Sequence, residues 1–201
     1  MDIEFKISKN PVNYKKALQL LEKRVEEVKK GGRELVWFLE HPTTYTAGIR
    51  YKKEEILDNS INVIKTNRGG KITLHNPGQK IVYFVIDLNR RKKNIRNLVR
   101  EIENIIIKFL KIYKIKSYAD KKNIGIWVNR KKIAAIGIRV SRWVAYHGFS
   151  ININNNLDDY KKIVPCGLNN EKITSFKKEG KKSLNINKNL KNIFLKNLPK
   201  I

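Results

Sequence analysis

The chain has 201 residues, 41% of them hydrophobic, which is enough for one domain over residues 1–201 with a substantial core. Its 44 Lys and Arg against 18 Asp and Glu give a net charge of +26, but the lysines are scattered in pairs without an Arg-rich arm or an aromatic RNA-binding motif, so nucleic-acid binding is not expected. No apolar run is long enough to span a bilayer, and the start MDIEFKISKN does not resemble a signal peptide, so a cytosolic protein is expected. The single cysteine excludes an internal disulfide, and no metal site is expected.

The first part of the chain predicts a strand, an amphipathic helix and a second strand. Residues 3–7 form the first strand, and residues 34–39 form the second. Between them, Asn10-Pro11 provides an N-cap followed by a proline at the first helical position, and Gly31-Gly32 ends the helix. The helix is expected to lie on a sheet through one apolar stripe: Tyr14, Leu18, Leu21, Val25 and Val28.

Residues 40–65 predict a loop, a polar linker and a short strand. Proline and glycine mark residues 40–48 as the loop. Polar residues define the linker at 52–60, and the strand follows at 62–65. His41 in the loop has two interpretations. It either bonds to nearby backbone or forms part of the wall of a binding site.

The run RGGKITLHNPGQ, residues 68–79, is the first candidate for ligand binding. Paired glycines at Gly69-Gly70 let a backbone approach a ligand closely and present its N–H groups, and Arg68 can meet an anion or an amide oxygen. A simple turn between strands is the alternative.

Residues 80–153 predict the centre of the sheet. A strand at 80–88 precedes a long helix at about 94–113, and a strand at 125–128 leads into a hairpin of residues 133–140 and 143–153. After it, the ITSF run at 173–176 is expected to pack back on the core, and the tail from Ser183 predicts a last short helix. This order of strands and helices argues for an α+β fold with helices packed on a mixed, mostly antiparallel sheet.

Lys132 and Cys166 form the candidate reactive pair. The hairpin followed by a turn at Val164-Pro165-Cys166-Gly167 can bring the cysteine back beside the lysine. An ammonium within a few ångströms favours the thiolate, which is the form that attacks an acyl carbon. Lys131 is expected to point to the opposite face of the strand. The alternative is a buried cysteine that acts as a small hydrophobic residue.

Three runs, KIAAIGIRVSRWVAYHGFSININ, IVPCGL and RGGKITLHNPGQ, resemble the octanoyl-[acyl-carrier-protein]:protein octanoyltransferases, the lipoyl(octanoyl) transferases of lipoic acid synthesis. The resemblance extends from the LEHPTTYTAG run near Glu40 to the ITSF run. It implies the fold of biotin and lipoate protein ligases, no cofactor, and a monomer. It also implies octanoyl-acyl carrier protein as donor, with lipoyl domains of 2-oxoacid dehydrogenase complexes and the glycine cleavage H protein as acceptors.

The same resemblance assigns roles to individual residues. Cys166 is the implied nucleophile and Lys132 its partner, while His147 is expected to line the site. The family pattern usually has an acidic residue at Lys71, a tyrosine at Leu74 and a glycine at Asn76, so these departures concern the shape of the pocket. The implied substrate-binding residues are Arg68, Gly69, Gly70, Lys71, Ile72, Thr73, Leu74, His75, Ala135, Ile136, Gly137, Gly148, Phe149 and Ser150.

Two other functions stay open for this fold. An ATP-dependent lipoate or biotin-type ligase typically has a glycine triplet in place of Arg68-Gly69-Gly70 and does not need the cysteine. A non-catalytic module that binds acyl-proteins is the other. The net charge has three explanations: phosphate binding, docking to acidic proteins, or a bias toward Lys, Asn and Ile throughout the chain.

Overall fold

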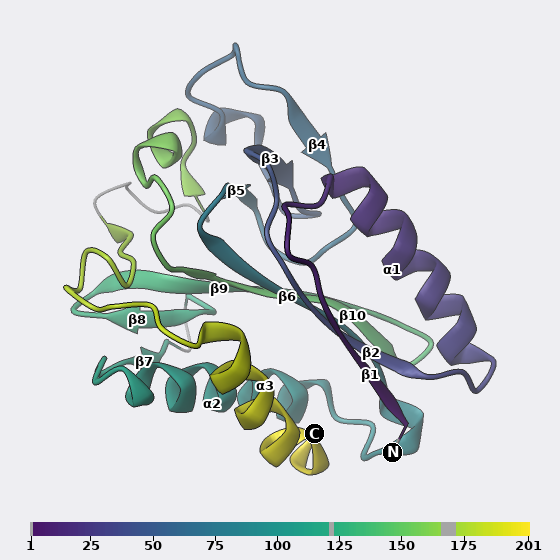
Figure 1. Cartoon of the computed structure of the whole chain (residues 1–201). Helices are drawn as coiled ribbons and strands as arrows, with labels where there is room; N and C mark the ends of the chain where they lie inside the picture. Colours follow the sequence, from purple (N-terminus) through teal and green to yellow (C-terminus); the bar gives the residue numbers. More distant parts are fainter. Residues whose placement is uncertain (1, 121–122, 166–171) are drawn as a thin grey trace.

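The computed structural model describes residues 2–120, 123–165 and 172–201, which form two β-sheets and three α-helices (Figure 1). The larger sheet has seven strands, in the order β1-β2-β6-β10-β9-β8-β7. Its strands are β1 (Ile3–Ile7), β2 (Glu34–Leu39), β6 (Gln79–Asp87), β7 (Tyr118–Ala119), β8 (Ile126–Val128), β9 (Lys131–Ser141) and β10 (Val144–Asn152). The smaller sheet has the order β4-β3-β5, with β3 (Thr44–Ala47), β4 (Val63–Lys65) and β5 (Ile72–His75).

Strand directions confirm the predicted mixed sheet. Strands β1 and β2 are parallel, as are β3 and β4, and all other pairs are antiparallel. Strand β10 occupies the middle of the larger sheet because it pairs with β6 on one side and with β9 on the other. The hairpin that the sequence predicts is therefore central to the fold.

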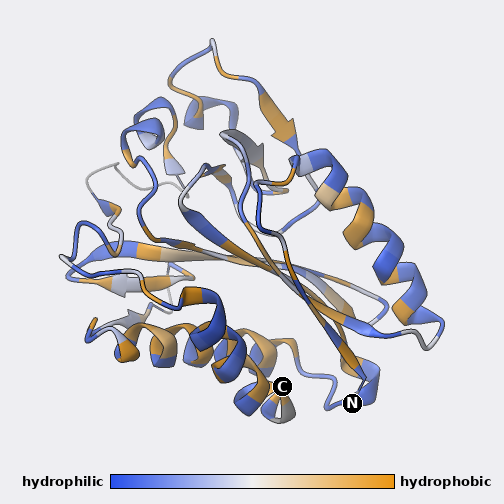
Figure 2. Ribbon diagram, viewed as in Figure 1, coloured by the Kyte–Doolittle hydropathy of each residue, from blue (hydrophilic) through white to orange (hydrophobic). Residues whose placement is uncertain are grey.

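The helices cover both faces of the larger sheet (Figure 1). Helix α1 (Tyr14–Lys29) packs on one face, and α2 (Ile95–Ile112) and α3 (Ile186–Asn197) pack on the other. Apolar and polar residues alternate along α1 and α2, as their amphipathic patterns require (Figure 2). Among the helices that the structure describes, none has the length and apolar character needed to cross a bilayer.

The start of helix α1 differs from the prediction. Asn13, not Asn10, caps the helix, since its side chain accepts a hydrogen bond from the Lys16 N–H at 3.2 Å. The residue before it, Val12, is outside the helix, and its N–H donates to the Glu40 carbonyl at 2.8 Å. Backbone pairing with the end of β2 thus delays the helix beyond Pro11.

Two predicted loops contain strands. Residues 44–47, inside the predicted loop at 40–48, form β3, and residues 72–75 of the glycine-rich run form β5. They pair with each other and not with the larger sheet. Their pairing depends on contacts distant in sequence, which proline and glycine signals do not reveal.

The hairpin and the C-terminal part follow the prediction closely. Its turn is Arg142-Trp143, one residue later than expected, and both residues have positive φ (49° and 66°), as a two-residue hairpin turn of type I′ requires. The ITSF run is buried, and Thr174 N–H donates to the Lys132 carbonyl at 3.0 Å. The last helix, α3, is also confirmed.

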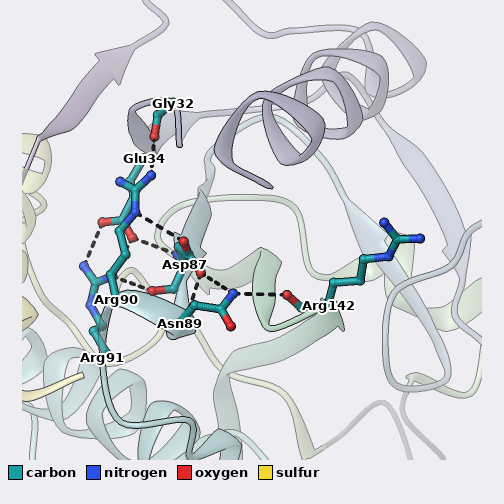
Figure 3. Close-up of polar contacts among 7 residues, drawn as sticks. All are labelled: Gly32, Glu34, Asp87, Asn89, Arg90, Arg91 and Arg142. Carbon is teal, nitrogen blue, oxygen red and sulfur yellow. Dashed lines mark hydrogen bonds and ion pairs between the residues drawn. The ribbon is translucent and has the colours of Figure 1, made fainter. Parts of the chain in front are cut away.

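A buried polar network closes the end of the larger sheet where β2 starts and β6 ends (Figure 3). Arg91 binds both carboxylate oxygens of Glu34, and their side chains are only 4% and 1% exposed. Glu34 also accepts a hydrogen bond from the Asp87 N–H at 2.7 Å. Asn89 links Asp87 to the Arg142 carbonyl, so the network joins β2, β6 and the turn of the hairpin.

Candidate active site

A cavity lies between the glycine-rich segment and strands β6, β9 and β10. Its empty volume is about 490 Å³, a figure that includes space open to solvent. Its walls are mostly apolar. The lining residues are Tyr14 of α1; Arg68, Gly69, Gly70, Lys71, Thr73 and His75; Ile81 and Tyr83 of β6; Ala135, Ile136 and Gly137 of β9; and His147, Gly148, Phe149 and Ser150 of β10.

The structure brings all the predicted binding residues to this cavity except Ile72 and Leu74. These two side chains are fully buried on the other face of β5, where they pack with Tyr45 and Tyr160 in a separate core. The sequence indicated a glycine-rich binding run or a turn at this point, and no strand. Because the segment is a strand, alternation directs only Lys71, Thr73 and His75 to the cavity.

Tyr14, Ile81 and Tyr83 line the cavity but were not predicted to do so. Tyr14 begins the apolar stripe of α1, and a stripe residue is normally interpreted as core. Ile81 and Tyr83 lie on the same face of β6, two residues apart, opposite Ser150 and Gly148 of β10. Period-two alternation in the strand at 80–88 was the one signal that could have found this pair.

The glycine-rich segment is held tightly on the sheet. A Cβ on Gly69 would lie 2.8 Å from the Ile138 carbonyl oxygen of β9, so only glycine allows this approach. Arg68 is buried, and its guanidinium donates to the carbonyl and the hydroxyl of Thr46 at 2.8 and 2.9 Å. It therefore meets amide oxygens of the protein itself, and it anchors the segment to β3.

His75 is a neutral ring with a defined tautomer. Gln79 donates through Nε2 to the side chains of Asn152 and Tyr160, both at 2.9 Å, so its Oε1 is the acceptor for His75 Nδ1–H at 2.7 Å. Burial is the main cause that lowers the pKa of His75 to about 3, and the neighbouring His41 adds to it. The Nε2 lone pair thus stays unprotonated at neutral pH.

The other two histidines of the chain, His41 and His147, belong to the same region. His41 bonds the Val12 carbonyl through Nδ1 at 2.6 Å and accepts from the Tyr83 hydroxyl at 2.9 Å. It does not line the cavity, which favours the backbone-bonded interpretation. Burial lowers the pKa of His41 to about 4 and, with Arg68 and Arg139 contributing, that of His147 to about 3.

His147 stands in an unusual backbone conformation for a strand residue. Its φ is +67°, a region that is rare outside glycine, and the next residue, Gly148, has a φ of +157°. His147 Nε2 lies 2.8 Å from Asn67 Oδ1, and Arg139 donates to the Asn67 carbonyl at 3.0 Å. Together these bonds fasten the residue before Arg68 to the central hairpin.

Lys132 lines a second, smaller cavity that shares walls with the first. Thr73, Ala135 and Ser150 belong to both cavities. The lysine is 8% exposed, whereas Lys131 is exposed on the opposite side, as alternation predicts. Pro165 also lines the smaller cavity. Cys166, the residue after it, lies outside the described residues, so the predicted pair of Lys132 and Cys166 stays a prediction.

No group of three His, Cys, Asp or Glu side chains suited to a metal ion occurs in the part of the chain that the structure describes.

Gln79 and Asn152, which hold His75 in place, were not predicted as part of the site. Both lie at strand ends, where the sequence offers no signal for side chains that meet from two strands.

Comparison with curated proteins gives close relatives. The chain is 47% identical over 185 residues to the octanoyltransferase of Ehrlichia chaffeensis, an alignment covering 89% of this chain and 86% of that protein. It is 46% identical over 188 residues to the octanoyltransferase of Anaplasma phagocytophilum, covering 90% of both chains. The octanoyltransferase of Bartonella tribocorum is 42% identical over 189 residues, or 87% of this chain and 77% of that one.

Solved structures support the fold. A putative lipoate protein ligase from T. acidophilum with bound lipoic acid superposes with a TM-score of 0.81 at 15% identity, covering 98% of this chain and 86% of that one. Biotin protein ligase from Aquifex aeolicus gives 0.53 at 12% identity, covering 100% and 69%. The predicted biotin/lipoate ligase-like fold is thereby confirmed. Residues 13–197 match the model of the lipoyl protein ligase A/B catalytic domain, and the chain belongs to this family.

Proposed function

We propose that the chain transfers an octanoyl group from octanoyl-acyl carrier protein to a lysine of lipoyl domains, through an acyl-Cys166 intermediate. One observation carries this proposal: a mostly apolar cavity shares Thr73, Ala135 and Ser150 with a smaller one that contains a buried lysine. The first suits an acyl chain and the second suits acyl chemistry. The close octanoyltransferase relatives support the same assignment.

In the first half-reaction the Cys166 thiolate attacks the thioester carbonyl of the donor. A new carbon–sulfur bond forms, the bond to the carrier sulfur breaks, and the carrier thiolate takes a proton from the Lys132 ammonium. In the second half-reaction the amine of the acceptor lysine attacks the acyl-cysteine. Cys166 leaves as thiolate, and the amine proton passes to Lys132, which is then ready for another cycle.

The pocket supplies apolar walls for the chain and backbone for the carbonyl. Ile136 and Phe149 also pack against the core under α2, so strand alternation indicates that they offer mainly backbone atoms to the cavity. Gly137 and Gly148 lie opposite each other and leave room for the chain. His75 lines the same space, and its unprotonated Nε2 can accept a hydrogen bond there.

The proposal includes the remaining properties that the family resemblance implies. The acyl group arrives already activated as a thioester, so the proposed enzyme needs no cofactor. It acts as a single catalytic domain and a monomer in the cytosol. Its acceptors are lipoyl domains of 2-oxoacid dehydrogenase complexes and the glycine cleavage H protein.

Intact-protein mass spectrometry after incubation with octanoyl-acyl carrier protein tests the proposal. We expect the parent protein to gain one octanoyl group, and Cys166→Ala to gain none while its circular dichroism is unchanged. Normal transfer by Cys166→Ala would overturn the covalent mechanism. The ATP-dependent ligase alternative predicts a different result, namely that free octanoate with ATP is transferred to a lipoyl domain. A non-catalytic module would bind the acyl carrier protein and turn over neither donor.

A further inference from the structure

The strand that carries Lys132 contains a β-bulge. Ile126 of β8 pairs with Ala134 of β9, but the next residue, Trp127, pairs with Lys132, so β9 has one extra residue, Ile133. Ile133 and Ala134 both lie in the core under α2. Because side chains alternate along a strand, the extra residue changes the face on which Lys132 lies. It places the lysine on the side of Ala135, toward the two cavities, instead of in the apolar core.

Gly125, just before β8, leaves space for the end of the lysine side chain. A Cβ on Gly125 would lie 2.3 Å from Lys132 Cε and 3.1 Å from Nζ. It would also lie 2.6 Å from the Ala134 carbonyl oxygen, and the φ of Gly125 is +141°. Lys132 therefore extends across a backbone position where any other residue would meet it.

Trp127 also contacts the end of the lysine side chain. Lys132 Nζ lies 5.5 Å from the centroid of the Trp127 ring, within the range of a cation–π interaction. The tryptophan is 4% exposed, and its indole N–H donates to the Asn123 carbonyl at 3.0 Å, which fixes the ring. The indole thus holds the ammonium without a negative charge of its own.

Other lysines near the site differ from Lys132 in one respect. Lys71 pairs with Glu55 at 2.8 Å and Lys80 with Glu40 at 3.1 Å. No carboxylate of residues 2–120, 123–165 or 172–201 forms an ion pair with Lys132. A buried carboxylate would neutralise the lysine locally, whereas an aromatic face leaves its charge available to an anion in the cavity.

We propose that Gly125 and Trp127, together with the bulge at Ile133, form a lysine cradle whose function is to position Lys132 in the site. This inference rests on the proposed role of Lys132 in acyl transfer. Gly125 and Trp127 are positioning residues, since they act on the reaction through the lysine. The cradle explains how Gly125 and Trp127, which line neither cavity, bear on the chemistry.

The test compares Gly125→Ala, Trp127→Leu and Trp127→Phe with Lys132→Met. The readouts are the pH profile of alkylation of Cys166, the single cysteine, by iodoacetamide, and the kcat and KM for octanoyl-acyl carrier protein. For Gly125→Ala and Trp127→Leu we expect the apparent thiol pKa to rise by roughly one unit toward that of Lys132→Met. We expect kcat to fall about tenfold with little change in KM, because the walls of the larger cavity are untouched. Trp127→Phe keeps a ring face and should stay near the parent.

Two matched controls separate positioning from general damage. Gly31→Ala introduces a side chain at a φ of +92° where no atom lies within 4 Å, so it measures backbone strain alone. Trp143→Leu removes an indole that faces Lys93 at 5.8 Å on the surface. Neither should move the thiol profile. Circular dichroism establishes folding, and if Gly125→Ala does not fold, the two Trp127 variants decide.

The outcomes are distinct. The cradle is overturned if folded Trp127→Leu keeps the parental thiol profile and kcat while Lys132→Met changes both. An equal loss in Trp127→Phe and Trp127→Leu would also count against it, because the aromatic face would then be irrelevant. A parental profile in Lys132→Met would instead overturn the proposed role of Lys132 in the reaction.

Discussion

The two ends of the seven-stranded sheet bury polar groups in different ways. Where β2 starts and β6 ends, Glu34 and Arg91 are buried as a bidentate ion pair (Figure 3). At the cavity end, the buried groups are the neutral histidines and Lys132, for which the described residues show no ion pair. The first arrangement satisfies its charges internally and can only hold the fold together. The second leaves a cation and a lone pair that a ligand can use.

This difference follows from the energetics of burial. An ion pair with complete hydrogen bonds tolerates burial, and removing one partner leaves an uncompensated charge. A histidine avoids that penalty by remaining neutral, which its lowered pKa expresses. Groups perturbed in this way gather at functional sites. The comparison therefore predicts that variants at the cavity end lose activity, whereas variants at the network end lose stability.

Lys132→Met should give the largest loss of activity. We expect turnover to fall by about 10² to 10⁴-fold, because proton transfer in both half-reactions is lost, with little change in thermal stability. Lys131→Met is the matched control, since that side chain is exposed on the opposite face, and its turnover should equal the parent's. Equal losses in both variants would contradict the strand register. Steady-state transfer to a lipoyl domain measures both.

Arg91→Met should give the opposite pattern. Glu34 would stay buried without its partner, so we expect the free energy of unfolding to fall by about 3–5 kcal/mol in urea denaturation. Activity per folded molecule should not change, because the network lies at the other end of β6. The double variant Glu34→Leu/Arg91→Met removes both charges and should regain much of the loss. A large loss of kcat in folded Arg91→Met would break the comparison.

Sequence patterns sufficed for the helices and for every strand of the larger sheet except the two-residue β7, because their signals are local. Apolar stripes defined α1 and α2, and β-branched runs defined β9 and β10. The strands β3 and β5 were missed because each is stabilised by pairing with the other across distant sequence. The same missed strand accounts for Ile72 and Leu74, which alternation turns away from the cavity.

The cavity could be predicted from sequence only where a motif marks it. Residue patterns indicated the glycine-rich run and the hairpin, and the family resemblance assigned them to substrate binding. Tyr14, Ile81 and Tyr83 have no motif and line the cavity through packing. No sequence pattern predicts the bulge at Ile133, because an extra residue can be recognised only when the pairing of the two strands is known. Gly125 was predicted as the first residue of the strand at 125–128, and nothing in the sequence signals its contact with Lys132.

The cavity end should also make the fold sensitive to acid. The folded-state pKa values of His75 and His147 are about 3 and that of His41 about 4, below the ordinary value of about 6.5. Between these limits the unfolded chain binds protons that the folded chain does not. The stabilisation is thus complete above about pH 6.5 and is lost as the pH falls toward the folded values.

Urea unfolding at pH 7 and pH 5 measures this effect. We expect the free energy of unfolding to be lower at pH 5 than at pH 7 by up to about 2 kcal/mol for each of these histidines. His41→Asn removes one of the three buried rings, so the dependence on pH should flatten by about a third while other contributions remain. An unchanged slope in His41→Asn would show that the histidines do not control the acid response.

The smallest expected effect concerns the net charge of +26. Acyl carrier proteins and lipoyl domains are generally acidic, so a cationic enzyme should attract both, and this attraction is screened over about 8 Å at physiological ionic strength. We expect the apparent second-order rate to fall by roughly tenfold between low and high salt. Single-turnover deacylation by saturating acceptor should change much less, because that step takes place in a partly desolvated pocket.

A bias in composition predicts no dependence of the rate on salt. Arg139 can separate the two explanations, and a lysine pair away from the cavities is the control. Lys177 and Lys178 are exposed and line neither cavity, so replacing both with glutamine should leave the rate and its salt dependence unchanged under either explanation. Arg139 is exposed and donates to the carbonyl of Asn67, the residue before the cavity-lining Arg68. Arg139→Gln should therefore reduce the salt dependence if charge captures the partners. A rate that is flat from low to high ionic strength would remove the net charge from partner capture and leave recognition to the shape and apolar walls of the cavity end.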